Sequence, residues 1–468
     1  MFVFADLELV NKLPHSKLMA AEALQYHPER TPPPMRDSQI FHQDFRERPF
    51  WWEAAPPVGR EQPPAKTVDV AVVGGGYAGL SAALHLARGG ARVAVLEAGE
   101  FGIGASSRNA GMVSGGNFLG KGLKGLTETE AAAMIGEASG ALDLVEEIIA
   151  REGIDCHYER TGRVVAAAVP AHYEAMSASV DRLNRVADAQ AVMLPRSRQR
   201  EEMATDAYAG GMIVNRTGKL HPALYLHGLL AATERAGAQL HSACEALSIA
   251  GAPGKFDLQT TRGSIRAGQV VIATNGYTGA LTPALRRRVV PVGSYMIATE
   301  PLPRDLAETL LPNGRTLTDS RRVLRYGRMS PDGTRLLFGG RARFSPQAAT
   351  AAAPALYRFM TDVFPQVKGY RLTHAWCGNV AFTFDFLPHA GQREGLHYCL
   401  GSNGSGISMM TMLGRNVAAR ILGAADAGAF DRPSFPTRPL YAGNPRLFLP
   451  LVGSAYKFQD WLDRRRAG

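Results

Sequence analysis

Three spaced glycines near residue 75 are the strongest chemical signal in the sequence. Gly74, Gly76 and Gly79 lie in "VVGGGYAG", directly after the β-branched run "VDVAVV" and before an apolar pattern of helical spacing. The first glycine permits a tight turn, the second lets a pyrophosphate approach the backbone, and the third lets helix and strand pack closely. Glu97 ends the next strand-like run, where a carboxylate can bind ribose hydroxyls. This arrangement predicts a βαβ unit that binds a dinucleotide.

The loop that follows this unit favours FAD over NAD. Residues 102 to 116, "GIGASSRNAGMVSGG", are mostly small and hold one cation, Arg108, and one amide, Asn109. Small side chains allow the backbone to pass over a bulky ring system, whereas a nicotinamide-dependent dehydrogenase would continue into a third crossover strand. The turn that ends the apolar run "GQVVI" predicts a second wall of the nucleotide site, formed by Ala273, Thr274 and Asn275.

A second glycine turn, near residue 404, repeats the order strand, turn, helix in "YCLGSNGSGISMMTMLGRNVAARIL". A helix that begins near Gly406 would aim the positive end of its dipole at the ligand, and a reduced flavin carries negative charge. The sequence has no second GxGxxG motif in a full βαβ context, so no NAD(P)H-binding domain is expected. We therefore expect the substrate to reduce the flavin, and molecular oxygen or another acceptor to reoxidise it.

The composition is that of a globular protein with several domains. At roughly 150 residues per domain, 468 residues correspond to about three units. The cysteines form no C-x-x-C pair, so neither a disulfide framework nor a metal site is expected. No apolar run reaches the roughly 18 residues of a membrane-spanning helix, and the N-terminus lacks the pattern of a secretory signal. A cytoplasmic location is therefore expected.

The charge of the chain is basic, at +10, with arginine clusters at residues 286–288 and 464–466. Positive charge attracts anionic partners of many kinds. The sequence has no aromatic residues interleaved with basic runs and no nucleic-acid-binding module. We interpret the clusters as solvated surface and do not expect a nucleic-acid partner.

The order of helical and strand-like patterns predicts the fold class. It is an α/β protein in which a Rossmann-like FAD-binding domain is interleaved with an α+β substrate domain built on a mostly antiparallel sheet. A Pro- and aromatic-rich arm precedes the first strand, with Trp51 and Trp52 as expected anchors. The expected divisions are an N-terminal arm at 1–65, FAD-binding parts at 66–158, 211–292 and 373–430, substrate-domain parts at 159–210 and 293–372, and a basic C-terminal tail and helix at 431–468.

Longer stretches resemble a known superfamily. "VVGGGYAGLSAALHLARGGARVAVLEAGEFGIGASSRNAG" is similar to the opening of the D-amino-acid oxidase and glycine/sarcosine oxidase superfamily. "VVIATNGYTGALTPALRRRVVPVGSYMIATEPL", "LLFGGRARF" and "HAWCGNVAFTFDFLPHAG" most resemble its γ-glutamylputrescine oxidase branch. The similarity runs from about residue 36 to near the C-terminus.

The resemblance implies non-covalent FAD and oxidation of a C–N bond, with a role in polyamine catabolism. Hydride would pass from the carbon beside an unprotonated amine to the flavin, and the imine would hydrolyse to a carbonyl compound and an amine. Such chemistry needs geometry more than a strong acid or base. The expected partners are a small amine and an electron acceptor, and an oligomer is compatible with the sequence.

Two departures from the family pattern bear on the substrate. Amino-acid-oxidising relatives often read Trp-x-Gly-x-Arg-Pro-x-Thr-Pro-Asp, in which the Arg can hold the substrate carboxylate. This chain keeps Trp376 and Gly378 but has Val380 and Ala381 in place of the Arg-Pro pair, so a simple α-amino acid is disfavoured. It also has Ser405 where the amine-oxidase branch often has a His.

The resemblance and the strand patterns together give the expected site residues. Arg328 is the candidate for binding a distal carboxylate of the substrate. The expected substrate face comprises Trp376, Tyr295, Arg328, Ser405, His374, Tyr326 and Phe382. The expected cofactor-binding residues are Gly74, Gly76, Tyr77, Ala78, Gly79, Glu97, Ala98, Ser106, Ser107, Arg108, Asn109, Ala110, Gly111, Met112, Ala246, Ala273, Thr274, Asn275, Gly378, Asn403, Gly404, Ser405, Gly406 and Ile407.

Three alternatives to an amine oxidase remain open at this point. One is a D-amino-acid or N-methyl-amino-acid dehydrogenase that delivers electrons to a quinone, which the missing Arg at position 380 disfavours. Another is a tRNA-associated flavoprotein, which the basic charge allows. The third is a flavin-binding protein without turnover, which Ser405 in place of His allows.

Overall fold

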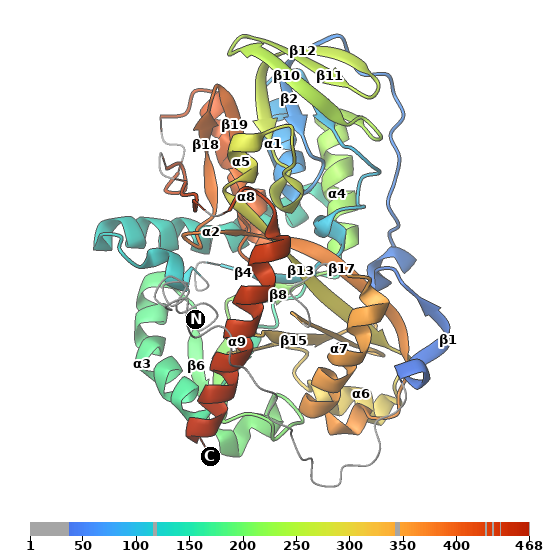
Figure 1. Ribbon diagram of the computed structural model, residues 1–468, viewed down its shortest axis with the longest axis vertical. Helices are drawn as coiled ribbons and strands as arrows, with labels where there is room; N and C mark the ends of the chain where they lie inside the picture. Colours follow the sequence, from blue (N-terminus) through green and yellow to red (C-terminus); the bar gives the residue numbers. More distant parts are fainter. Residues whose placement is uncertain are drawn as a thin grey trace.

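Two large β-sheets, one above the other in Figure 1, organise the chain. The computed structural model describes residues 37–115, 119–341, 347–425, 428–432, 435–439 and 441–467. The upper sheet carries the glycine motifs and the lower sheet carries the expected substrate face. The chain crosses between the sheets several times, so the two domains are interleaved.

The upper sheet has a parallel centre with the order β19-β12-β2-β3-β9. Helices cover both faces of such a centre, which explains why β2 and β3 are almost continuously apolar. An antiparallel meander of β10, β11 and β12 extends it on one side. The strands are β2 (Thr67–Val73), β3 (Val93–Leu96), β9 (Gln239–His241), β10 (Ala246–Ala252), β11 (Lys255–Thr260), β12 (Gly263–Ile272), β18 (His389–Arg393) and β19 (Leu396–Leu400).

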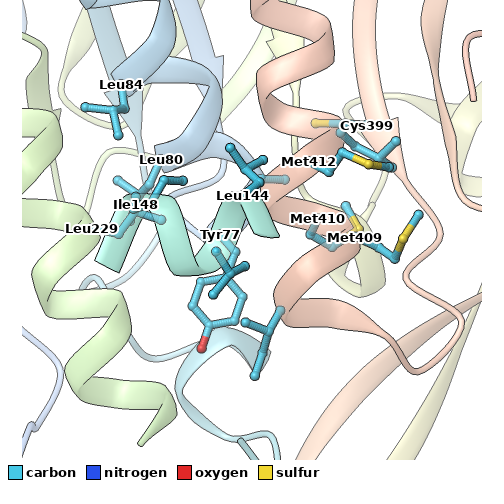
Figure 2. Close-up of a cluster of buried hydrophobic side chains, with 14 of the residues drawn as sticks. Tyr77, Leu80, Leu84, Leu144, Ile148, Leu229, Cys399, Met409, Met410 and Met412 are labelled. Carbon is cyan, nitrogen blue, oxygen red and sulfur yellow. The ribbon is translucent and has the colours of Figure 1, made fainter. Parts of the chain in front are cut away.

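Four helices pack on the upper sheet and bury its largest core, part of which Figure 2 shows. They are α1 (Tyr77–Arg88), α2 (Glu128–Glu152), α4 (Pro222–Arg235) and α8 (Gly406–Ile421). Leu80 and Leu84 from α1 share this core with Leu229 from α4 and with Met409 and Met412 from α8. Helix α2 begins with a capping box, in which Thr127 and Glu130 satisfy each other's backbone N–H groups. The apolar faces of all four helices meet in this one core.

The lower sheet has nine strands in the order β1-β17-β13-β16-β15-β14-β5-β7-β6, and most neighbours are antiparallel. Helix α7 (Ala349–Val363) covers one face, and the other face looks toward the FAD-binding domain. The strands are β1 (Phe41–Arg46), β5 (Arg163–Ala166), β6 (Ala191–Leu194), β7 (Gly211–Val214), β13 (Val289–Thr299), β14 (Thr316–Asp319), β15 (Arg325–Met329), β16 (Leu336–Gly340) and β17 (Leu372–Thr383).

The remaining elements link or flank the two sheets (Figure 1). The small sheet of β4 and β8 lies between them. No helix among the described residues is both long and apolar enough to cross a membrane. The linking elements are β4 (Met112–Ser114), β8 (Thr217–Lys219), α3 (Pro170–Ala187), α5 (Pro283–Arg286), α6 (Arg304–Leu310) and α9 (Pro445–Ala467).

The observed division of the chain differs from the expected one at three places. Strand β7 starts at the expected boundary of residue 211 but pairs with β5 and β6 in the lower sheet. Strand β17 also belongs to the lower sheet, although residue 373 was the expected return to the FAD-binding domain. The arm contributes β1, which pairs in parallel with β17. Strand patterns do not reveal which sheet a strand joins, because pairing is a tertiary choice. Residues 1–36 of the expected arm lie outside the described residues.

The crossing of α1 and α8 leaves no room for a side chain at Gly414. A Cβ there would lie 2.3 Å from the carbonyl oxygen of Ala78 and 2.9 Å from the nitrogen of Ala82. Beside it, the hydroxyl of Ser81 donates a hydrogen bond of 2.6 Å to the carbonyl of Thr411. The two glycine turns can therefore meet at one edge of the sheet only if residue 414 stays small.

We predict that Gly414→Ala destabilises the fold by about 1–3 kcal/mol, because the added methyl group forces the two helices apart. Gly136→Ala is the matched control, since Gly136 lies in α2 with open space around its Cα, and it should gain about 0.4–1 kcal/mol. Denaturant unfolding of both variants measures the difference. Equal stabilities of the two variants would show that the crossing is not tight.

Candidate active site

The first glycine turn has the geometry of a phosphate cradle. Gly74 has a φ of 107°, in the left-handed region that favours glycine. A Cβ at Gly79 would lie 1.9 Å from the carbonyl oxygen of Gly74, so helix α1 can start this close to the turn only with glycine at position 79. Helix α1 begins at Tyr77, and its N-cap, Gly76, makes no side-chain cap. The backbone N–H of Tyr77 donates to the hydroxyl of Ser106 at 3.1 Å, and the next N–H groups of the first turn are placed for a phosphate.

Glu97 stands at the end of β3 beside this turn. Its carboxylate accepts hydrogen bonds from the backbone N–H of Gly75 at 2.8 Å and of Gly99 at 3.2 Å. These bonds fix the carboxylate at the edge of the cradle, where a ribose would lie. The sequence-based role for Glu97 fits this position.

A cavity of about 710 Å³ extends from the turn along the carboxyl ends of the parallel strands. Ligands of open α/β sheets bind at this edge. Eleven of the expected cofactor residues line it: Gly74, Gly76, Glu97, Ala98, Ser106, Arg108, Ala246, Ala273, Thr274, Asn275 and Gly378. Its size, its cradle and the Glu97 carboxylate at its edge fit FAD. No histidine lines the cavity among the described residues.

Several expected cofactor residues support this cavity without lining it. Tyr77 is buried and donates to the carbonyl of Pro222 at 2.9 Å. The hydroxyl of Ser107 accepts the indole N–H of Trp52 at 2.9 Å. Position 111 accommodates only glycine, because a Cβ there would lie 2.1 Å from the carbonyl oxygen of Leu220. Tyr77, Ala78, Gly79, Ser107 and Gly111 are absent from the lining of both cavities, and direct contact of these residues with the cofactor stays a prediction.

Side chains from distant segments hold the loop that follows the cradle. The indole of Trp51 donates to the carbonyl of Asn109, and that of Trp376 donates to the carbonyl of Arg108, each at 2.8 Å. The guanidinium of Arg328 donates to the carbonyls of Ala110 at 3.2 Å and Gly111 at 3.3 Å. The arm and the lower sheet thus fix the loop of the FAD-binding domain.

The second glycine turn closes the same region from the other side. Strand β19 ends at Leu400, and helix α8 starts at Gly406, as the sequence predicts. Asn403 has a φ of 46° and accepts the N–H of Thr383 at 3.1 Å through its side-chain carbonyl. Residues 403–407 of this turn line a second, smaller cavity.

This second cavity, of about 280 Å³, lies between the loop, the second glycine turn and the lower sheet. Ala105, Arg108, Gly378 and Asn379 line both cavities, so the two meet at these residues. A flavin in the larger cavity would present its ring system at this junction. We therefore identify the smaller cavity as the candidate substrate site.

Three of the expected substrate-face residues line this cavity, namely Tyr326, Phe382 and Ser405. The hydroxyls of Tyr326 and Ser294 lie 2.8 Å apart. Burial raises the pKa of Tyr326 to about 12, so the phenol stays neutral at physiological pH. The expectation for Tyr295 is corrected. It packs on the opposite face with α7, because successive residues of a strand alternate faces.

The expectations for Arg328, His374 and Trp376 are also corrected, because none of them lines either cavity. Arg328 is 1% exposed and is engaged by loop carbonyls and by the ring of Trp51, 5.4 Å from its guanidinium carbon. The side chain of His374 lies 3.1 Å from a carboxylate oxygen of Glu53 in the arm. All three share a sheet face with the cavity, but the arm covers that part of the face.

The sequence patterns missed several cavity residues. Arg163, Asp319 and Arg341 line the smaller cavity, and Tyr277 lines the larger one although half of it is exposed. Tyr277 follows the predicted turn at residues 273–276, which was a usable signal. Arg163 is the first residue of an apolar strand, and no local pattern shows that it faces a cavity.

Two further tests of the site concern covalent attachment and metals. Gly378 lines both cavities and has no side chain that could bond to a flavin. Burial raises the pKa of the neighbouring Cys377 thiol, which keeps it protonated. Among the described residues, no group of three or more potential metal ligands is found.

We predict that Gly79→Ala lowers FAD affinity at least about tenfold, since its methyl group would displace Gly74 and open the cradle. Titration of the apoprotein with FAD, followed by flavin fluorescence, measures the change. Gly140→Ala, in α2 with open space around it, is the control and should bind FAD like the unmodified protein. Unchanged affinity in Gly79→Ala would contradict the role of the close turn.

Comparisons with known proteins identify the family of the chain. The sequence matches the family described as DAO, FAD dependent oxidoreductase, over residues 69–420. It is 31% identical to gamma-glutamylputrescine oxidoreductase of Escherichia coli (strain K12) over 401 residues, which covers 83% of this chain and 92% of the relative. The crystal structure of glycine oxidase from Geobacillus kaustophilus superposes with a TM-score of 0.66 at 23% identity, covering 80% of this chain and 99% of that one. The crystal structure of L-proline dehydrogenase from P. horikoshii superposes with a TM-score of 0.65 at 17% identity, covering 78% of this chain and 98% of that one. The chain therefore belongs to the DAO family of FAD-dependent oxidoreductases.

Proposed function

We propose that this FAD-dependent enzyme oxidises the C–N bond of an extended amine of the γ-glutamylputrescine kind. The observation that carries the proposal is the junction of the two cavities at Gly378 and Arg108. A substrate carbon at this junction would lie beside the ring system of a flavin bound in the larger cavity. The similarity to gamma-glutamylputrescine oxidoreductase supports this substrate class.

The lining of the substrate cavity argues for an amine over a simple α-amino acid. Val380 lines the cavity at the position where amino-acid-oxidising relatives often have an arginine. A small amino acid would therefore lack a guanidinium from this position of β17. Leu119, Leu324, Phe382 and Phe386 provide apolar walls that suit an alkyl chain.

When bound, FAD accepts the hydride that leaves the carbon beside the nitrogen. The residues of the chain position the amine and limit the access of water. The hydroxyl pair of Tyr326 and Ser294 and the Ser405 turn can hydrogen-bond a neutral amine, and the apolar walls favour its uncharged form. Loss of the hydride leaves an iminium ion, which water hydrolyses to a carbonyl compound and a protonated amine. Molecular oxygen or another acceptor would take up the electrons.

Anaerobic mixing with a set of amines tests the proposal. We expect γ-glutamylputrescine to bleach the visible flavin absorbance faster than putrescine, sarcosine or D-alanine, and readmission of oxygen then separates an oxidase from a dehydrogenase. Reduction by D-alanine alone would favour an amino-acid dehydrogenase instead. A protein that none of the four amines reduces would refute the proposed substrate class.

We predict that the pH dependence of flavin reduction follows the substrate and not the protein. The rate at low substrate concentration should rise about tenfold per pH unit up to the pKa of the substrate ammonium group, because only the neutral amine gives up hydride. No histidine lines either cavity among the described residues, and Tyr326 has a pKa of about 12. Stopped-flow measurements should therefore give the same profile for Tyr326→Phe. A change in the rate of flavin reduction near pH 6.5 that is the same for every amine would instead indicate an ionising group of the enzyme.

A further inference from the structure

The substrate cavity contains positive charge far from the cofactor junction. Besides Arg108 at the junction, two guanidiniums line it, those of Arg163 and Arg341. These two side chains are 5% and 6% exposed, so their charges are shielded from solvent. Burial lowers the pKa of each to about 10, which leaves both charged at neutral pH.

The register of the lower sheet shows how the cavity extends. Gly378 pairs with Ser294 on the next strand, and farther across the sheet Tyr326 pairs with Thr318, which pairs with Val165. All five residues line the cavity, and they lie in two adjacent rows of the sheet, because Tyr326 is in register with Met296 and Trp376, two residues along from Ser294 and Gly378. Five strand spacings separate β17 from β5, which corresponds to about 24 Å in a flat sheet.

Both guanidiniums lie away from the junction at Gly378. Arg163 precedes Val165 by two residues on the same face of β5, which is the lining strand most distant from β17. The guanidinium carbon of Arg341 lies 4.7 Å from the ring centre of Phe382. Phe382 is four residues along β17 from Gly378, about 13 Å away. A ligand group beside Arg163 is thus well separated from a C–N bond at the junction, and one beside Arg341 is displaced from the junction toward Phe382.

The carboxylate that lines the cavity has its own partners. Asp319 is the one acidic side chain among the described lining residues. Its carboxylate pairs with Arg321 at 2.5 Å and accepts the backbone N–H of Arg325 at 3.0 Å. Neither arginine partner of Asp319 lines the cavity. The balance of charge along the lining therefore favours an anionic group of the ligand.

We propose that Arg341, with Arg163 adding positive charge, binds a carboxylate that the amine substrate carries at the end remote from the oxidised C–N bond. This inference rests on the proposed function and adds a specificity determinant to it. It also moves the carboxylate-binding role from Arg328, which lines neither cavity, to Arg341, which lines the substrate cavity. A planar guanidinium suits this role because it can bind both oxygens of a carboxylate.

Matched substrates test the inference on the unmodified holoenzyme. The amide of putrescine with glutaric acid carries one distal carboxylate, and the butanoyl amide of putrescine has the same reacting amine without it. We expect the carboxylate to raise the ratio kred/Kd for flavin reduction by about 10- to 100-fold. Equal values for the two amides would overturn the inference and leave amine oxidation standing.

Variants assign the effect to the residue. Arg341→Met should remove most of the preference for the carboxylate while changing kred/Kd for the butanoyl amide by less than about threefold, and Arg341→Lys should keep part of the preference. Arg304→Met, at a 91% exposed side chain, is the control and should keep all of it. An equal loss for both amides in Arg341→Met would indicate a structural role and overturn the assignment.

A binding measurement separates this inference from the proposed function. Glutarate has no amine to oxidise, so its binding to the oxidised holoenzyme, followed by calorimetry, reports on the carboxylate site alone. We expect binding to weaken at least about tenfold in Arg341→Met. If no amine reduces the flavin but glutarate binding depends on Arg341, the proposed function fails and the anion site stands. If glutarate does not bind the unmodified protein, the anion site is refuted.

Discussion

The backbone carbonyls of residues 108 to 111 accept hydrogen bonds from side chains of other parts of the chain. Trp51 comes from the arm, Trp376 from β17 and Arg328 from β15. The side chains of Arg108 and Asn109 also bond to backbone groups of the loop, so internal and outside donors order it together. Because Arg108 borders both cavities, the same bonds fix the wall where cofactor and substrate meet.

These hydrogen bonds to the carbonyls of residues 108 to 111, called the seam below, also explain why the two domains are interleaved. The loop belongs to the FAD-binding domain, but its donors belong to the lower sheet and to the arm, which pairs with that sheet through β1. Buried carbonyls without partners cost free energy, so the two sheets are stable together only when the seam is formed. The cavities between the sheets are a consequence, since each has walls from both domains.

The chemistry of the substrate cavity follows from this construction. Near the junction, backbone and small residues make room for a ring system, and the hydroxyls of Tyr326 and Ser294 provide neutral hydrogen-bonding groups. Farther along the sheet the walls become apolar and then positively charged, with Arg341 and Arg163. With Arg108 at the junction as well, the lining carries positive charge at both ends, and the proposed carboxylate site uses the end remote from the flavin.

The sequence by itself determined the features whose signals are local. The turn at Gly74, Gly76 and Gly79, the carboxylate of Glu97 and the start of α8 at Gly406 follow from short motifs, because backbone geometry dictates the residue types there. Only the tertiary structure decided the substrate face. Strand alternation placed Tyr295 on the far side, the arm covered Trp376 and His374, and the loop carbonyls engaged Arg328. Arg163 and Arg341 carry no local signal, because the pairing of strands distant in sequence determines which side chains face a shared cavity.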